Sequence, residues 1–183
     1  NKINRRDDQY GGSLVNRSRI IIEIIDGIRK QCRSNFMLGV RLSPERFGMQ
    51  LPEILIVAQR LMDGGQIDFL DMSLWDVFKE SNDENMRGKS LLSCFTELDR
   101  KGVRLGAAGK IRTPAEAEKA LASGVDWIML GRAAILHHDF PEQYRKNTNF
   151  SPVEIPVTRE HLVKEGLSEK FIAYMSSWEG FVA

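Results

Sequence analysis

Residues 103–114 read VRLGAAGKIRTP, and residues 125–132 read VDWIMLGR. Each stretch begins with a short apolar run, passes through glycine and leads into residues that favour a helix. Thr113 and Pro114, with Glu116 shortly after, are typical of a helix start in which Thr113 is the cap and Pro114 the first helical residue. Both stretches are therefore predicted to form a buried β-strand, a turn and a helix.

The same strand-then-helix pattern occurs twice more, earlier in the chain. Strands are predicted at Met37–Leu42, Phe69–Ser73, Val103–Ala107 and Val125–Leu130. Helices are predicted from Asn16, from Pro52 to Gly64, over Leu91–Arg100, from Pro114 to Gly124, after Arg132, over Arg159–Glu165 and over Ser168–Ser176. Four such units with short connections indicate parallel strands and right-handed crossovers. An open doubly wound sheet and part of a barrel both fit, although no strand is followed by the GxGxxG of dinucleotide-binding sheets.

Two further features of the chain lead to structural expectations. The inward face of the first helix is predicted to be formed by residues at helical spacing, Ile20, Ile24, Ile25 and Ile28. Residues 1–13 and 74–89 are predicted to be loops, and the second is so long that a functional or disordered segment is expected. The three tryptophans are interpreted as packing residues rather than stacking platforms for a ligand: Trp75, Trp127 and Trp178.

The composition argues against several kinds of partner. The 183 residues carry a net charge of +1, which gives no electrostatic footprint for nucleic acid or an anionic membrane. The longest apolar run, Ile20–Ile25, is far too short to cross a bilayer. Cys32 and Cys94 are interpreted as buried thiols, which favours a reducing cytoplasm. No His, Cys or carboxylate residues have metal-ligand spacing, so no metal site is predicted. The chain opens at Asn1 without an initiator methionine, and we expect it to be a piece of a longer protein.

Two successive turns at strand ends are the strongest indication of a ligand-binding site in the sequence. Ala108, Gly109 and Lys110 follow the third strand, and Gly131 and Arg132 follow the fourth. Small residues let the backbone approach an anion, and the N–H groups at the following helix start are expected to be unpaired. The turns after strands 7 and 8 of (β/α)8 barrels commonly bind phosphate, and the Arg132 guanidinium suits phosphate oxygens. A phosphate site is therefore predicted, against the alternative that these glycines serve only the turns.

Arg41, at the carboxyl end of the first strand, is the candidate catalytic residue. A charge within an apolar strand is costly unless it is paired, so two interpretations remain open. Arg41 forms an ion pair at the rim, or it is a fixed cation in the mouth of the site. Asp71 is predicted to be a structural partner for a neighbouring Arg or Lys, and Ser73 lies where it can reach a ligand. His137 and His138 are predicted at a solvent-facing helix start without a catalytic role.

Four motifs in order resemble one family. Residues 4–17, NRRDDQYGGSLVNR, resemble the segment that follows strand 4 in the Old Yellow Enzyme family of NAD(P)H-dependent flavin oxidoreductases. Residues 39–44, GVRLSP, are similar to that family's strand 5. Residues 107–114, AAGKIRTP, resemble its strand 7 turn, and residues 130–132, LGR, resemble its strand 8 turn. Lys110 stands where a second glycine is common, and it would act through its backbone N–H.

The resemblance implies a fold, a cofactor and a reaction. Residues 1–150 would be strands 5 to 8, the C-terminal half of a (β/α)8 TIM barrel, and residues 151–183 would be a helical tail. FMN would contact Arg41, Ser73, Ala108, Gly109, Lys110, Gly131 and Arg132, with its phosphate at the last two turns. Arg41 would lie beside flavin N1 and O2, where negative charge develops as hydride reaches N5. Hydride would pass from NAD(P)H through FMN to an electron-poor alkene such as an enone.

Two other functions remain open from the residues alone. A non-flavin phosphate-binding barrel lyase or isomerase would need a lysine or a carboxylate pair in the site mouth, where Lys110 is the only nearby lysine. A non-catalytic half-barrel that serves as an assembly module is the other alternative. Because four barrel strands leave two edges unpaired, we expect this chain either to associate as a homo-oligomer or to belong with residues upstream of Asn1.

Overall fold

The computed structural model describes residues 3–183 and contains one parallel sheet. Asn1 and Lys2, the first residues of the predicted opening loop, lie outside the described residues. The four strands are β1 (Gly39–Leu42), β2 (Phe69–Ser73), β3 (Arg104–Ala108) and β4 (Trp127–Met129). They pair in chain order, β1-β2-β3-β4, and every pairing is parallel. The four predicted strands are confirmed, with the first and fourth shorter than expected and the third shifted by one residue.

Helices separate the strands and continue beyond the last one. They are α1 (Leu14–Gln31), α2 (Leu51–Asp63), α3 (Leu91–Thr96), α4 (Pro114–Ala122), α5 (Arg132–Leu136), α6 (Phe140–Lys146), α7 (Arg159–Lys164) and α8 (Glu169–Met175). A 3₁₀ turn, η1 (Glu84–Met86), lies within the predicted long loop. The helix predicted over Leu91–Arg100 ends earlier, at Thr96. Among residues 3–183, no helix is long and apolar enough to cross a membrane.

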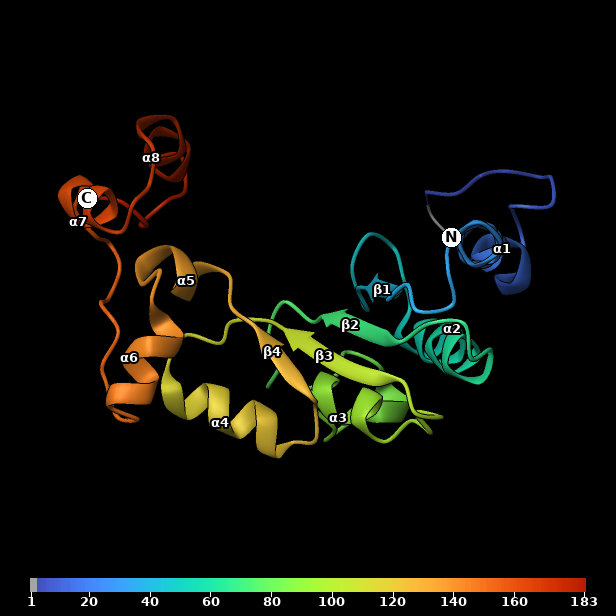
Figure 1. Ribbon diagram of the computed structural model, residues 1–183. Coiled ribbons are helices and arrows are strands. Elements are labelled where there is room, and N and C mark those ends of the chain that lie inside the picture. The colour runs from blue at the N-terminus through green and yellow to red at the C-terminus, as the bar shows by residue number, and fades with distance from the viewer. Residues whose placement is uncertain (1–2) are drawn as a thin grey trace.

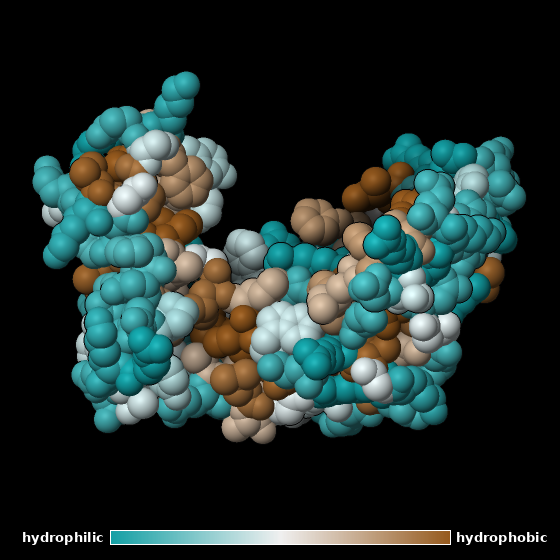
Figure 2. Space-filling model, in the orientation of Figure 1, coloured by the Kyte–Doolittle hydropathy of each residue, from teal (hydrophilic) through white to brown (hydrophobic). Residues whose placement is uncertain are grey.

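The two faces of the sheet have different environments. Leu70, Met72, Leu105 and Ala107 alternate with their neighbours and are fully buried within the core that includes α2, α3 and α4. Figure 1 shows these helices on one side of the strands, while no helix of residues 3–183 covers the other side. Figure 2 shows the surface hollowed there, between the C-terminal helices and the N-terminal end of the chain.

Two aromatic rings lie on the uncovered face of the sheet. Phe69 of β2 and Trp127 of β4 meet edge to face, with ring centroids 5.5 Å apart. They lie over two glycines, since a Cβ atom added at Gly39 would come within 2.1 Å of Phe69, and one at Gly106 within 2.1 Å of Trp127. The glycines are therefore needed for close approach of these rings. Trp127 is half-buried as expected, whereas Trp75 is exposed, contrary to the prediction.

The predicted inward face of α1 is wrong in part. Ile25 is buried and Ile28 packs against the core, but Ile20 and Ile24 are more than half exposed. Ile21, rather than Ile20, shares the inward face with Ile25 and Ile28. A run of consecutive isoleucines offers apolar residues on several faces of a helix, so spacing alone does not select the one that meets α2.

The C-terminal segment has a hydrophobic cluster of its own. Its buried members are Leu136, Val157, Leu162, Ile172, Met175 and Phe181. Leu136 belongs to α5, so the segment beyond residue 150 packs onto the helix that directly follows β4. Trp178 packs against this cluster, as the sequence predicted. The predicted helices in this region are confirmed as α7 and α8.

Candidate active site

The parallel strands bring all the predicted site residues to one edge of the sheet. Arg41 of β1 pairs in register with Asp71 of β2, and Ser73 pairs with Ala108 of β3. The turn after β4 begins next to Ala108, because Ala108 pairs with Met129. The carboxyl ends of parallel strands are where ligands of such folds commonly bind.

Arg41 forms the rim ion pair that one of the two interpretations predicted. Its Nε lies 3.3 Å from Oδ2 of Asp71, and its Nη2 donates a 3.2 Å hydrogen bond to Oγ of Ser73. The Arg41 side chain is nonetheless 56% exposed, and its Nη1 has no hydrogen-bond partner among residues 3–183. Pairing therefore holds the guanidinium in place and leaves part of it available to a ligand. Asp71 is the structural partner that the sequence predicted.

Asp71 is an unusual group for a strand interior. Its side chain is only 8% exposed, and its Oδ1 is buried without a hydrogen-bond partner among the described residues. Burial raises the pKa of the Asp71 carboxyl, and the positive charge of Arg41 opposes that rise. The Arg41 contact is thus the interaction that favours the charged form of Asp71.

The turn after β3 is fixed by the loop that follows β2. Leu74 N–H donates to the Ala108 carbonyl at 2.8 Å, and Val77 N–H donates to the Gly109 carbonyl at 3.2 Å. A Cβ atom at Gly109 would come within 2.8 Å of the backbone nitrogen of Asp76, so this position requires glycine. Lys110 has a left-handed φ of 50°, and its Nζ lies 3.2 Å from Oδ2 of Asp76.

The backbone N–H groups of the two turns are free, while those at the start of α4 are not. Within residues 3–183, the N–H groups of Gly109, Lys110, Gly131 and Arg132 donate no hydrogen bond. By contrast, the N–H groups before α4 are occupied by its capping box, which joins Arg112, Thr113 and Glu116. The sequence predicted unpaired N–H groups at the helix starts, and for α4 this is wrong because the Glu116 carboxylate already accepts two of them.

Arg132 lies at the first position of α5, next to Gly131, which provides no side-chain cap. Arg132 lines a cavity of 710 Å³ together with Arg112 and the segment 148–155. Burial and the like charge of Arg112 both lower the pKa of the Arg132 guanidinium. Neither arginine forms an ion pair with a carboxylate among residues 3–183. Two unneutralised cations at one cavity are suited to an anionic ligand.

The long loop after β2 is ordered by a residue that sequence reasoning missed. The Glu45 side chain is 7% exposed, and its carboxylate accepts hydrogen bonds from Lys79 Nζ, Ser81 Oγ and Asn82 N–H. Burial opposes the charge, but these bonds together lower the pKa of Glu45. The contacts bridge more than thirty residues of sequence, so no local pattern reveals them.

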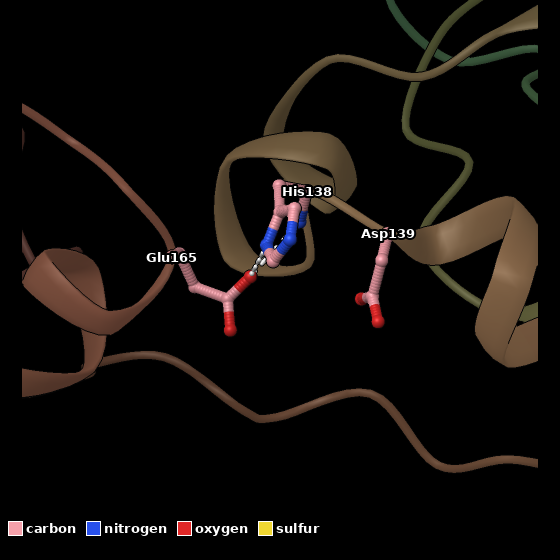
Figure 3. Close-up of side chains that lie close together, drawn as sticks. All are labelled: His138, Asp139 and Glu165. Atoms are coloured by element: carbon pink, nitrogen blue, oxygen red, sulfur yellow. Dashed lines mark hydrogen bonds and ion pairs between the residues drawn. The ribbon is translucent and has the colours of Figure 1, made fainter.

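The fold also gathers the three histidines at the contact between α5 and the C-terminal segment. Nε2 of His137 accepts a hydrogen bond from Val153 N–H, and Nε2 of His161 lies 2.8 Å from the Leu136 carbonyl. His138, Asp139 and Glu165 lie close together, and each carries an atom of a type that binds metal ions (Figure 3). The sequence predicted no such group because Glu165 lies on a distant helix end.

Comparison with known proteins identifies the family. The model of the NADH:flavin oxidoreductase / NADH oxidase family matches residues 1–150. The chain therefore belongs to that family, whose members bind FMN. The resemblance seen in the four motifs is confirmed.

Individual relatives are larger than this chain. A cinnamate reductase from Clostridium sporogenes is 29% identical, over 76% of this chain and 24% of the relative. An NADH:flavin oxidoreductase from Gibberella zeae is 30% identical, over 70% of this chain and 35% of the relative. The chain thus spans well under half the length of these relatives.

Solved structures show the same fold. Morphinone reductase in complex with tetrahydroNAD superimposes with a TM-score of 0.62 at 23% identity, over 87% of this chain and 41% of the other. The Old Yellow Enzyme homologue from Zymomonas mobilis gives a TM-score of 0.58 at 24% identity, over 87% of this chain and 44% of the other. The parallel α/β arrangement is therefore that of part of these enzymes.

Proposed function

We propose that this chain supplies strands 5 to 8, the C-terminal half, of a (β/α)8 barrel that works as an FMN-dependent ene-reductase. Three features support a partial barrel: the uncovered sheet face, the two unpaired edge strands and the chain's short coverage of its relatives. The assignment to the C-terminal half is supported by the order of the four family motifs along the chain. In this proposal residues 1–150 form the barrel half, and residues 151–183 form a helical tail packed on α5.

The free N–H groups of the two strand-end turns are the single observation that carries the cofactor proposal. Gly109, Lys110, Gly131 and Arg132 would hold the FMN phosphate through backbone N–H groups, and the Arg132 guanidinium would add a charged contact. Ala108, at the end of β3, would line the approach to this site. Lys110 contributes its N–H only, since its side chain is engaged with Asp76.

Arg41 would act at the other end of the cofactor. Its guanidinium, held by Asp71 and Ser73, would face the flavin pyrimidine near N1 and O2. A cation fixed in advance stabilises negative charge that develops there, without reorganisation during the reaction. Ser73 would position Arg41 and lie within reach of the same ring.

FMN, when bound, accepts hydride from NADH or NADPH and delivers it to the β-carbon of an electron-poor alkene such as an enone. The residues of this chain would bind the phosphate, fix the ring through Arg41 and shield one side of the site. The groups that anchor the alkene and donate a proton would come from the remainder of the barrel.

Two free cysteines, Cys32 and Cys94, support a reducing cytoplasmic location.

The test is an absorption spectrum of the full-length protein, followed by NADH and NADPH oxidation assays with an enone. We expect the visible bands of bound flavin and alkene-dependent oxidation of a reduced nicotinamide. A protein without flavin that acts on a phosphorylated substrate would instead support a lyase or isomerase. A protein without flavin or turnover would support an assembly module.

A further inference from the structure

A cluster of three side chains joins the α5–α6 turn to the end of α7. His138 and Asp139 precede α6, and Glu165 is the C-terminal cap of α7. Each offers a ligand atom, and these atoms all lie within 4.8 Å of one another. Figure 3 shows the His138 ring directed at the Glu165 carboxylate, with the Asp139 carboxylate on the opposite side of His138 from Glu165. This cluster is separate from the strand-end turns.

Hydrogen bonds join His138 to Glu165, whereas other polar atoms of the three side chains have no partner among residues 3–183. Oε2 of Glu165 accepts hydrogen bonds from the His138 backbone N–H at 2.9 Å and from its ring Nδ1 at 2.7 Å. Oδ2 of Asp139 accepts a bond from Gln143 at 2.9 Å. Within residues 3–183, Nε2 of His138, Oδ1 of Asp139 and Oε1 of Glu165 have no hydrogen-bond partner. Each side chain therefore retains ligand capacity.

The charges of the cluster are not balanced by the protein. Glu165 is only 10% exposed, yet neither it nor Asp139 contacts a lysine or arginine in the described part of the chain. Among residues 3–183, the one ion-pair partner of these carboxylates is His138, whose side chain is 64% exposed. Two carboxylates held together are costly unless a cation neutralises them.

We propose that His138, Asp139 and Glu165 bind one divalent transition-metal ion, with Zn²⁺ as the best match. One imidazole nitrogen and two carboxylate oxygens form a ligand set that zinc accepts, with a fourth position left for water. Zinc ligand bonds of about 2.0–2.2 Å place neighbouring ligand atoms about 3.3 Å apart. The cluster, whose ligand atoms lie within 4.8 Å of one another, would contract around the ion, and the 2.7 Å contact between His138 Nδ1 and Glu165 Oε2 would open by a few tenths of an ångström. The nitrogen ligand favours Zn²⁺ over Mg²⁺ or Ca²⁺, which prefer oxygen donors.

The ion would fasten the C-terminal segment to the barrel half. Two ligands lie directly after α5, and the third lies at the end of α7, which contacts α5 in the shared hydrophobic cluster. A metal that binds only the folded arrangement stabilises it by mass action. The role is thus structural, and it does not depend on flavin or on the proposed reaction.

The test is calorimetric titration of Zn²⁺ into the chelator-treated full-length protein, with thermal unfolding at several Zn²⁺ concentrations. We expect one site per chain, a rise of the unfolding temperature with Zn²⁺, and much weaker binding of Mg²⁺. His138→Gln, Asp139→Asn and Glu165→Gln should each weaken Zn²⁺ binding by more than about tenfold, because loss even of an outer-shell partner can cost that much.

Two charge-matched variants serve as controls. Glu160→Gln removes a carboxylate from the same helix as Glu165, and Glu142→Gln removes one from the helix that follows Asp139. Both should bind Zn²⁺ like the wild type. Equal Zn²⁺ affinity of Glu165→Gln and Glu160→Gln would overturn the proposal.

A measurement on wild-type protein avoids any effect of the substitutions on folding. Anomalous diffraction at the zinc edge, from crystals grown with Zn²⁺, should show a peak bounded by His138, Asp139 and Glu165. The absence of a peak at these three residues would refute the site, whatever the flavin content of the crystals.

Discussion

Arg41 Nε lies 3.3 Å from Oδ2 of Asp71, its register partner on the next strand. A mostly exposed cation is thus anchored by a buried anion that has no other charged partner among residues 3–183. Any substitution at Arg41 therefore affects two properties, the charge offered to a ligand and the stability of the carboxylate beneath it.

Arg41→Ala in the full-length enzyme should slow flavin reduction by roughly 100-fold, because a cation opposite developing charge is worth on the order of 3 kcal/mol. It should also destabilise the fold by about 1–3 kcal/mol, since Asp71 would remain buried without its partner. Stopped-flow reduction of the flavin and chemical denaturation measure the two effects. The double variant Arg41→Ala/Asp71→Asn should recover stability but not the rate. Wild-type reduction in either variant would make Arg41 a structural rim residue only.

Arg132→Ala in the full-length enzyme should weaken FMN binding and leave the turnover of flavin-loaded protein nearly unchanged. The phosphate is remote from the reacting N5 atom, so its contacts stabilise ground and transition states alike. FMN titration into the apoprotein, with turnover measured at saturation, separates the two effects. Arg145→Ala, which removes an exposed arginine paired with Glu142, is the control. Equal FMN affinity of the Arg132 variant and the wild type would place the phosphate elsewhere.

Thr113→Ala should lower the free energy of unfolding by about 1 kcal/mol, because it removes the side-chain half of the capping box that starts α4. Thermal or urea unfolding of the full-length protein measures the loss. Thr148→Ala provides a matched control, since Thr148 is exposed and its side chain makes no hydrogen bond within residues 3–183. A loss no greater than that of the control would show that the cap contributes little.

The contact between His138 and Glu165 should make stability depend on pH in metal-free protein. The hydrogen bond to Glu165 raises the pKa of His138. The stabilisation of the fold by protonated His138 is therefore fully present below pH 6.5 and is lost as pH rises through the raised pKa. Burial opposes the charge of Glu165, but the hydrogen bonds from His138 lower the pKa of this carboxyl. The stabilisation of the fold by ionised Glu165 is therefore fully present above about pH 4.5 and is lost as pH falls through the lowered pKa. The stability difference between wild type and His138→Gln should therefore be larger at pH 6 than at pH 9. Thermal unfolding in chelator measures it, and a difference independent of pH would argue against the ion pair.

The isolated 183-residue chain should self-associate and should fail to bind FMN tightly. Its sheet has two unpaired edges and an uncovered face that carries Phe69 and Trp127. Such surfaces favour association in water, and a ligand usually needs most of its surface buried for tight binding. Analytical ultracentrifugation with and without FMN tests both expectations. A monomer that binds FMN at nanomolar concentration would contradict the half-barrel assignment.

Most of the secondary structure could be predicted because its signals are local. Thr113, Pro114 and Glu116 lie within one helical turn, and together they define a cap whose geometry the structure reproduces. Strand β2 has the predicted limits because Gly64-Gly65 and the polar loop bound a short apolar run. The buried face of α1 was predicted less well, since Ile20 and Ile21 are equally apolar and only packing against α2 determines which of them is covered.

The sequence by itself determined the four β/α units, and hence that Arg41, Ser73, Gly109 and Arg132 would follow strands at one edge. Parallel pairing makes this outcome independent of detailed contacts. Only the tertiary structure decided the partners of these residues, because they lie far apart in sequence. Strand register joins Arg41 to Asp71, and helix packing joins His138 to Glu165. The physical reason is that helix caps and strand periodicity depend on neighbours a few residues away, whereas these contacts require whole elements to be in place.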